Sequence, residues 1–159
     1  MELDLKRFVS DFLQVSRLAG KPLARADIEV EVLPRPHRRP SQLPERRQAV
    51  YVFATDSHCL KVGKVGPNSQ PRFVSQHYIA KPKGSCLANS LLAGAAAPDG
   101  LRQALGLLTP ENVGAWIETD TTRVRLYLRE EQPKVLLALL EAFAHCRFDP
   151  VFEGGDRRA

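Results

Sequence analysis

The sequence predicts an α+β fold, in which a small mixed or antiparallel sheet with a central hairpin is flanked by helices. Two short runs with β-forming residues, Gln48–Ala54 and Leu60–Lys64, are separated by the turn-forming residues TDSHC, a pattern typical of a hairpin. Helical spacing of apolar residues occurs near both ends of the chain, over residues 3–18 and from Pro133 to about Arg147. We therefore expect helices to pack around the hairpin, with the C-terminal helix in the core.

The other elements follow from apolar spacing and from the residues that break it. Gly20 and Pro22 end the first helix, and residues 27–33 alternate as a strand does. Pro71 suits the first turn of a helix that runs to about Ile79. Beyond it we expect short helices in CLANSLLAGA and LRQALGLL, and strands at residues 116–118 and 123–129 around the turn TDTT.

Composition bounds the class of protein. The chain has 159 residues, 43% of them hydrophobic, which is enough for one domain with a core. Its apolar runs are too short to span a bilayer, and the N-terminal MELDLKRF does not resemble a secretory signal. Three cysteines without a C-x-x-C pair make a disulfide framework or a zinc site unexpected, so a reducing cytoplasm is the predicted location.

Positive charge is concentrated in one segment. The chain carries a net charge of +5, and residues 34–47, PRPHRRPSQLPERR, contain five arginines and four prolines. The prolines exclude helix and sheet interiors. Taken alone, this segment is a solvated extended linker; the alternative is an arm that lies along phosphates.

Glu141 is the only ionisable residue in the apolar run VLLALLEAFA. The run predicts a buried helix, where a lone carboxylate is unfavourable unless a cation meets it. A metal ion, a neighbouring Lys or Arg, or a raised pKa are the alternatives, and the first two indicate a site.

Two further positions carry candidate chemistry. In a hairpin centred near Asp56, Tyr51 lies roughly opposite Lys61, so a phenol and an ammonium share one face of the sheet. This is either an ordinary solvated pair or one in which the ammonium favours the phenolate. Arg72, in the first turn of the following helix, is placed to touch a phosphate; taken alone, it is an ordinary surface arginine at a helix start.

These residues together resemble the GIY-YIG nucleases. Ala49-Val50-Tyr51 and Lys61-Val62-Gly63 stand for the two tripeptides, Arg72 for the helical arginine and Glu141 for the metal-binding glutamate, with Pro150 and Phe152 where the family has a proline and an aromatic residue. The resemblance covers 48–154 as a nuclease domain, after an N-terminal helix, strand and basic arm over 1–47 and before a tail at 155–159. Lys61 replaces the second tyrosine, as in one branch of the family. Glu153 replaces the usual asparagine, and residues 80–114 have no counterpart.

The resemblance implies a metal-dependent endonuclease that hydrolyses DNA phosphodiester bonds, of the restriction or defence kind. Glu141 would hold Mg²⁺ or Mn²⁺, Tyr51 would activate or position the water, Lys61 would lower the pKa of Tyr51 or orient that water, and Arg72 would neutralise the phosphate. His77 is either a contact to the phosphate, a proton shuttle, or structural.

The partner implied is DNA. A second copy of the chain is a further option, since two-fold recognition sites match two-fold proteins, but the sequence does not decide between monomer and homodimer. The expected phosphate contacts outside the site are basic residues: Arg35, Arg38, Arg39, Arg46, Arg47, Lys64, Lys81 and Lys83. Two other functions stay open, namely a catalytically degenerate nucleic-acid-binding module and an interaction domain in which Glu141 pairs with a Lys or Arg.

Overall fold

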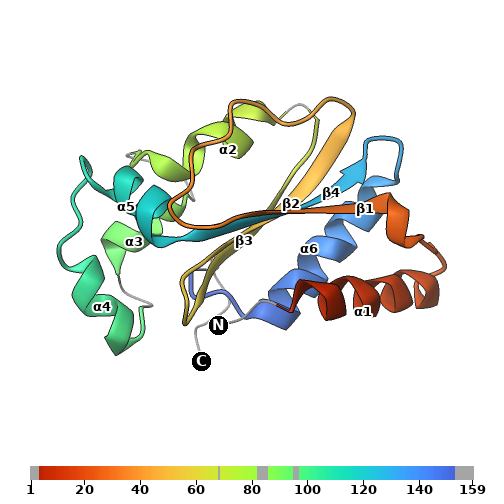
Figure 1. The fold of residues 1–159 in the computed structure, drawn as a ribbon, viewed down its shortest axis with the longest axis horizontal. Helices are drawn as coiled ribbons and strands as arrows, with labels where there is room; N and C mark the ends of the chain where they lie inside the picture. The colour runs from red at the N-terminus through yellow and green to blue at the C-terminus, as the bar shows by residue number, and fades with distance from the viewer. Residues whose placement is uncertain (1–3, 68, 82–85, 95–96, 153–159) are drawn as a thin grey trace.

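The computed structural model describes residues 4–67, 69–81, 86–94 and 97–152. Its centre is a four-stranded sheet in which every pair of neighbours is antiparallel (Figure 1). The strands follow one another across the sheet in the order β1 (Ile28–Leu33), β4 (Thr122–Arg129), β2 (Arg47–Ala54) and β3 (Cys59–Val65). The α+β class and the β2–β3 hairpin are therefore confirmed.

Two helices cover one face of the sheet, α1 (Leu5–Leu18) and α6 (Lys134–Phe148) (Figure 1). Asp4 caps α1 by accepting a hydrogen bond from the Arg7 N–H at 2.9 Å, and Gly20, with φ of 70°, lies just beyond its end. The core on this side joins apolar residues of both helices to the strands: Phe8, Val9, Phe12, Leu136, Leu140 and Ala144 pack with Val50, Val52, Val124 and Leu126.

The opposite face carries the shorter helices of the chain. These are α2 (Gln70–Val74), a 3-10 turn (Gln76–Tyr78), α3 (Leu87–Ala93), α4 (Asp99–Leu105) and α5 (Val113–Asp120). Alternate strand residues, Ala49, Tyr51 and Phe53, belong to the core on this side. The sheet is thus a middle layer, and Tyr51 faces the layer that also contains α2.

The register of the hairpin differs from the expected one. Tyr51 lies opposite Gly63, and Lys61 lies opposite Phe53, because the register shifts between Phe53 and Ala54. The prediction of a directly opposed Tyr51–Lys61 pair is wrong. A displacement of two residues keeps the same face, so Lys61 still shares a face with Tyr51. Leu60 packs on that face as well, with Tyr51 and Phe53.

Two predictions for the second half of the chain are wrong. Residues 116–118 are not a strand, because Val113 and Ile117 are spaced by one helical turn and α5 buries both of them. The predicted helix from Pro71 to Ile79 breaks at Ser75, where φ is −128°, into α2 and the 3-10 turn.

Helix α6 is not buried all round. Leu136, Leu140 and Ala144 face the core, whereas Val135 is 58% exposed and the Glu141 side chain is half-buried. The outward side of this helix carries alanines at 138 and 142, which raise the apolar content without requiring burial. Glu141 therefore lies at the border between the core and the solvent.

The first 47 residues brace the sheet. β1 pairs along β4 from Ile28–Leu128 to Leu33–Arg123, and the ring of Phe8 in α1 lies 5.0 Å from that of Phe143 in α6. The basic arm that follows β1 has no helix or strand and runs past α5 and α2 to β2 (Figure 1), with His37 and Leu43 buried. Over the described residues, every helix is too short or too polar to cross a bilayer.

Candidate active site

The phenol oxygen of Tyr51 is the point at which three of the predicted residues meet. Arg72, from α2, donates its Nε–H to this oxygen at 3.2 Å. His77, from the 3-10 turn, approaches the same oxygen with Nε2 at 2.6 Å. The structure therefore brings together a strand residue and two residues that follow the hairpin, as the sequence predicts.

The hydrogen bonds of His77 fix its tautomer. The Leu87 N–H at the start of α3 donates to Nδ1 at 3.2 Å, so Nδ1 carries no proton and Nε2–H donates to Tyr51. Burial, reinforced by the charge of Lys61, lowers the pKa of His77 to about 3. His77 is 1% exposed. It is thus a neutral group that orients Tyr51, and contact with a phosphate would require the buried ring to move.

Gly63 leaves the space that the phenol ring of Tyr51 occupies. A Cβ at this position would clash with the hydroxyl of Tyr51 and would lie 2.6 Å from Cζ. Because glycine has no side chain, the ring of Tyr51 can lie across β3. This contact is a physical reason for the glycine in Lys61-Val62-Gly63.

Tyr51 is a neutral phenol at pH 7. Burial raises its pKa, and it outweighs the opposing hydrogen bond and charge of Arg72 and the charge of Arg123. A phenol oxygen that accepts from both Arg72 and His77 still has its own proton to donate. Tyr51 is as buried as His77, at 0% exposed, so its hydroxyl could position a water or a phosphate oxygen only after a neighbouring side chain moves.

Lys61 differs from its expected role. Its charge acts on His77, and its ammonium donates to the Phe152 carbonyl at 3.3 Å. The side chain is 3% exposed. Lys61 thus connects the chain after α6 to the interior beneath Tyr51 and His77.

Glu141 meets a cation, and in the structure that cation is Lys64. The carboxylate accepts a hydrogen bond from the Lys64 ammonium on β3, with side chains 20% and 43% exposed respectively. Its charge also reaches Tyr51, whose pKa it raises. Of the three alternatives for a carboxylate on this helix, the neighbouring lysine is the one observed.

The donor set around Glu141 limits how a metal could bind. Within the described residues there is no group of three or more His, Cys, Asp or Glu side chains that could hold an ion. A divalent ion at Glu141 would therefore take its remaining ligands from water and substrate oxygens, an arrangement that Mg²⁺ accepts.

A cavity of about 390 Å³ connects these two parts of the site. Lys64, Arg72 and Lys134 supply three cationic side chains to its wall, and Gln48, Gly66, Pro67, Ser69 and Leu137 complete the lining. It lies where β3, α2 and the start of α6 meet. A cavity with this lining suits an anion.

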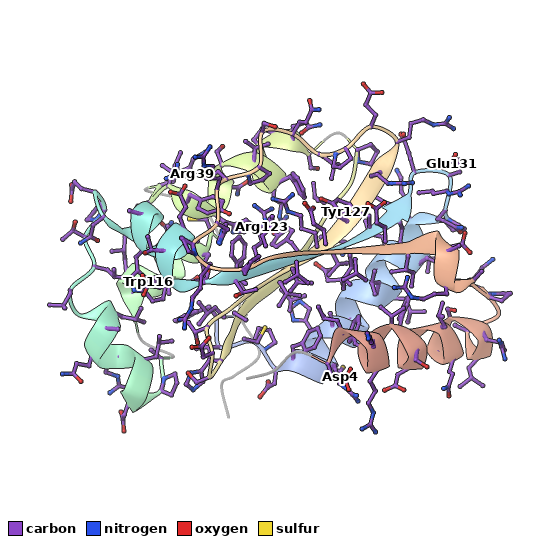
Figure 2. All side chains as sticks on the ribbon, viewed as in Figure 1. Asp4, Arg39, Trp116, Arg123, Tyr127 and Glu131 are labelled. Carbon is purple, nitrogen blue, oxygen red and sulfur yellow. The ribbon has the colours of Figure 1, made fainter. Side chains whose placement is uncertain are left out.

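Arg123 and Arg125, on β4, are the buried residues that sequence reasoning missed. Arg123 lies on the Tyr51 face and is fully buried (Figure 2). Its guanidinium lies 4.8–5.9 Å from the centres of four rings: Phe73, Phe53, Tyr51 and Tyr78. Arg125 lies opposite Tyr51 and donates to Glu31 at 3.0 Å. The sequence TRVRLYLR could have indicated them, because alternate residues of a strand share a face and both arginines therefore lie on the same side of the sheet.

Arg123 fixes the segment that presents the site. It donates to the Phe73 carbonyl at 2.7 Å and to the Tyr78 hydroxyl at 3.0 Å. Phe73 follows Arg72 in the chain and Tyr78 follows His77, so one side chain holds the segment beside both residues.

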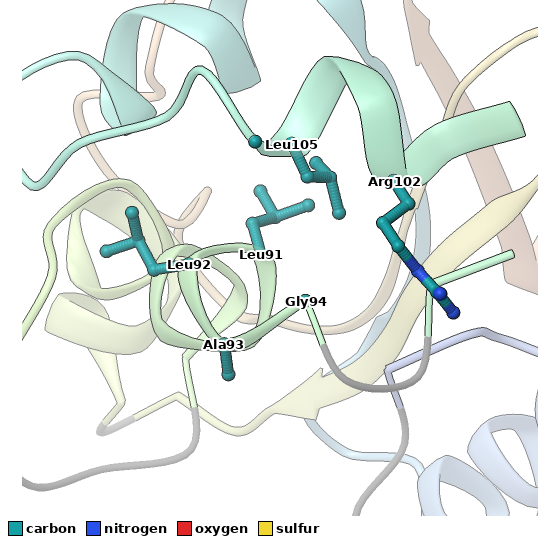
Figure 3. Close-up of a pocket in the computed structure, with 7 residues that line it drawn as sticks. Leu91, Leu92, Ala93, Gly94, Arg102 and Leu105 are labelled. Atoms are coloured by element: carbon teal, nitrogen blue, oxygen red, sulfur yellow. The ribbon is translucent and has the colours of Figure 1, made fainter. Parts of the chain in front are cut away.

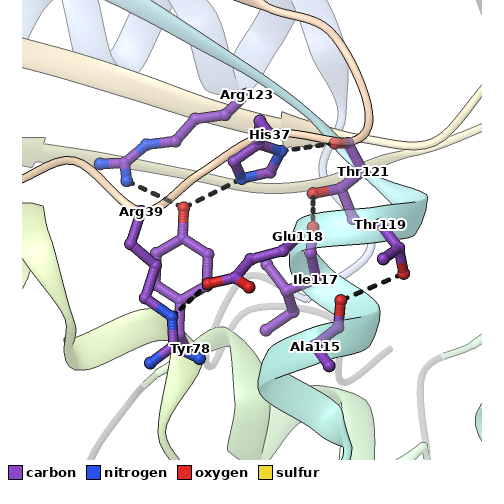
Figure 4. A network of polar contacts seen from close by, with 9 residues as sticks. All are labelled: His37, Arg39, Tyr78, Ala115, Ile117, Glu118, Thr119, Thr121 and Arg123. Atoms are coloured by element: carbon purple, nitrogen blue, oxygen red, sulfur yellow. Dashed lines mark hydrogen bonds and ion pairs between the residues drawn. The ribbon is translucent and has the colours of Figure 1, made fainter.

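The basic arm reaches the same network through His37 (Figure 4). His37 Nδ1–H donates to the Thr121 carbonyl at 2.8 Å, so its Nε2 accepts the Tyr78 hydroxyl at 3.0 Å. Burial lowers the pKa of His37, which keeps the acceptor nitrogen unprotonated. The arm is therefore anchored to the segment that carries His77.

Most arginines of the arm have acidic partners. Arg35 pairs with Asp56 and Arg39 with Glu118, while Arg46 and Arg47 lie 2.8 and 3.2 Å from Glu131 and Glu29. Arg38 is exposed and makes no ion pair within the described part of the chain. Contact with phosphates stays a prediction for these residues.

Two of the predicted phosphate contacts, Lys81 and Lys83, are not among the described residues that line the cavity. Lys81 is exposed, and its backbone binds the side chain of Asn89. Lys83 lies outside the described residues, as does Glu153. A second cavity, of about 430 Å³, lies between α3 and α4 (Figure 3). Leucines and Arg102 line it, and none of the predicted site residues does.

A search of protein-family models, curated proteins and solved structures finds no match to this chain.

Proposed function

We propose that this protein is a metal-dependent endonuclease that hydrolyses DNA phosphodiester bonds in the cytoplasm as a restriction or defence enzyme. The observation that carries the proposal is the convergence of Arg72 and His77 on the Tyr51 hydroxyl, beside a cationic cavity that Arg72 also lines. Hydroxyl, guanidinium and carboxylate together are groups that hydrolysis of a phosphodiester can use.

Each side chain has a role in this reaction. Arg72 is exposed at the cavity and stabilises the negative charge that grows on the phosphate in the transition state. Once the side chains that bury it have moved, the Tyr51 hydroxyl donates a hydrogen bond to the attacking water or to a phosphate oxygen and so orients it. His77 holds the phenol in place, and Lys61 helps to keep His77 neutral.

Glu141 would hold the divalent ion. Its half-exposed carboxylate offers the hard oxygen donor that Mg²⁺ and Mn²⁺ prefer, and Lys64 would then pair with a phosphate instead of Glu141. Such an ion would supply the positive charge that stabilises the phosphate and the leaving oxygen. The residues present fit such an ion, with substrate and water completing its ligands.

A second candidate is a nucleic-acid-binding module without catalysis. The ion pair between Glu141 and Lys64 favours it, because a carboxylate already matched by an ammonium needs no metal. The raised pKa of Tyr51 also favours it, since a neutral phenol is a poor base.

Plasmid DNA incubated with the protein and Mg²⁺ or Mn²⁺ tests the proposal. We expect nicking or linearisation by the parent, none by Glu141→Ala, and DNA binding by both. Glu131→Gln, which removes a surface carboxylate paired with Arg46, is the matched control and should cut normally. Equal cutting by Glu141→Ala would refute the role of Glu141.

The same assay separates the other functions. Salt-sensitive DNA binding without cutting of DNA or RNA would favour the binding module. An interaction domain would show neither cutting nor binding. Cutting of both strands at a two-fold site would require a homodimer, which the elution volume in size-exclusion chromatography reports.

A further inference from the structure

We infer that the cationic cavity holds a second DNA phosphate, next to the one at which cutting occurs, and that Lys134 binds it. This inference rests on the proposed function for the identity of the ligand as DNA. Lys134 was not among the phosphate contacts expected from the sequence. Its assignment follows from where the start of α6 lies.

Lys134 occupies a position that helix electrostatics disfavour. It is the first residue of α6, a helix of 15 residues with no acidic residue in its first turn. The N-terminus of a helix carries partial positive charge, so an added cation there is repelled and an anion is attracted. A lysine at this place makes the start of α6 suited to a negatively charged ligand.

The rest of the cavity wall reinforces this charge. Lys64 and Arg72 line the same cavity from β3 and α2, and none of its described lining residues is an Asp or a Glu. Lys64 is paired with Glu141, whereas Lys134 makes no ion pair within the described residues. The Ser69 hydroxyl makes no cap bond to α2 and can donate to a bound oxygen.

The cavity is large enough for more than one phosphate group. About 390 Å³ lies within the range of about 300–1,000 Å³ typical of small-molecule sites. Arg72 binds Tyr51 and therefore serves the reacting phosphate, while Lys134 approaches from α6. A phosphodiester adjacent along the same strand can lie against Lys134.

Binding measured in EDTA tests the inference without cutting. The parent, Lys134→Gln and the matched control Lys6→Gln, an exposed lysine of α1, are titrated against a fluorescent DNA duplex over a series of salt concentrations. We expect Lys134→Gln to bind about three- to fivefold more weakly, in the range of one solvent-exposed ion pair. The slope of log K against log salt should fall by about 0.9, the value for one phosphate contact. Lys6→Gln should match the parent.

Methylphosphonate substitution locates the phosphate. Neutralising internal phosphates one at a time should weaken binding by the parent at a position next to the cut site, and Lys134→Gln should be insensitive at that position. Unchanged affinity and salt slope in Lys134→Gln would overturn the inference. A second result would also overturn the inference. If Lys134→Gln and the parent bind equally once the 5′-phosphate of the DNA is removed, and if internal substitutions change nothing, then Lys134 binds a strand end and not an internal phosphate.

Two measurements keep the inference separate from folding and from catalysis. Lys134→Gln should unfold at the same temperature as the parent or slightly higher, since it removes a charge that the helix disfavours. If no variant or parent cuts DNA but Lys134→Gln still lowers the salt slope, the endonuclease proposal fails and the phosphate site stands.

Discussion

At the scale of single residues, the Tyr51 hydroxyl accepts hydrogen bonds from two donors, Arg72 and His77. Tyr51→Phe removes the acceptor of His77 and Arg72. We expect DNA cutting to fall by roughly 10²-fold or more if the hydroxyl acts in the reaction. The free energy of unfolding should fall by about 1–3 kcal/mol, because a buried N–H loses its partner.

Tyr127→Phe is the matched control for this substitution. It removes a hydroxyl that donates to Glu31 at 2.7 Å on the same face of the sheet. Stability should decrease by a similar amount in denaturant titrations while cutting is retained. A near-parental rate for Tyr51→Phe would remove the phenol from the reaction.

Gly63→Ala tests the contact that places the phenol. The added methyl group would overlap the ring of Tyr51, so the ring or β3 must shift. We expect a loss of about 1–3 kcal/mol in the free energy of unfolding, as for other overpacked sites. Cutting should fall with unchanged DNA affinity. Gly100→Ala, in α4 and away from the cavity, where a Cβ also meets no atom within 4 Å, should leave cutting at the parental rate and should not lower stability.

Buried histidine makes stability depend on pH. The pKa of His77 is about 3 in the folded protein against 6.5 for the unfolded chain, so the unfolded chain binds the proton first as pH falls. Its contribution to the free energy of unfolding is complete above pH 6.5 and is lost as pH falls from 6.5 to 3. At pH 5 the loss amounts to about 2 kcal/mol. The lowered pKa of His37 acts in the same direction. Urea titrations at pH 7 and pH 5 should show this difference, and it should shrink in His77→Gln; an equal difference in that variant would contradict the assignment.

At the scale of elements, the pairing of β3 with α6 governs the candidate metal ligand. Lys64→Met frees the Glu141 carboxylate, so we expect Mn²⁺ to bind more tightly than to the parent. Stability should change by no more than about 1 kcal/mol, because both side chains are partly exposed. Electron paramagnetic resonance of free Mn²⁺ measures the affinity.

Glu141→Gln in the Lys64→Met background is the control for metal binding. It replaces the carboxylate with an amide of the same shape and should abolish the added affinity. If the two variants bind Mn²⁺ equally well, Glu141 is not the ligand.

Elements with a strong pattern were predictable from the sequence. The strands β1, β2, β3 and β4 and the helices α1 and α6 lie within a residue or two of their expected bounds. The register of β2 on β3 was not predictable, because the hydrophobic alternation of the two strands does not reveal the shift between Phe53 and Ala54. α5 was mistaken for a strand because a short apolar run fits both periods.

At the scale of the whole molecule, the N-terminal 47 residues and the remainder share one sheet and the core between that sheet, α1 and α6. A fragment of residues 48–159 would lack β1, which pairs with β4, and α1, which packs on α6. We expect it to expose apolar surface and fail to fold cooperatively, since the core on that face would lose Phe8, Val9, Phe12 and Ile28.

Circular dichroism during thermal unfolding and size-exclusion chromatography compare the fragment with the full chain. A monomeric fragment with a sharp transition would show that 48–159 is an independent domain.

The candidate site was predictable only in part. Tyr51 lies in the hairpin and Arg72 follows it closely in the chain, so their positions alone made them candidates, whereas His77 was proposed only through the resemblance to the GIY-YIG nucleases. Arg123 could not be proposed in the same way, because a charged strand residue normally faces solvent and its burial depends on four rings from other segments. Long-range packing of this kind leaves no local pattern.

The two borders of the sheet are not equivalent. Val151 and Phe152 donate N–H groups to the Cys59 and Leu60 carbonyls at 2.9 Å, which closes one end of the β3 border, and Gly63 and Lys64 on the rest of it belong to the candidate site. A copy of the chain that extended the sheet there by strand addition would block access to Tyr51. Of the two borders, only the far one, where Val32 of β1 is 48% exposed, could pair with a second copy by strand addition without covering the candidate site.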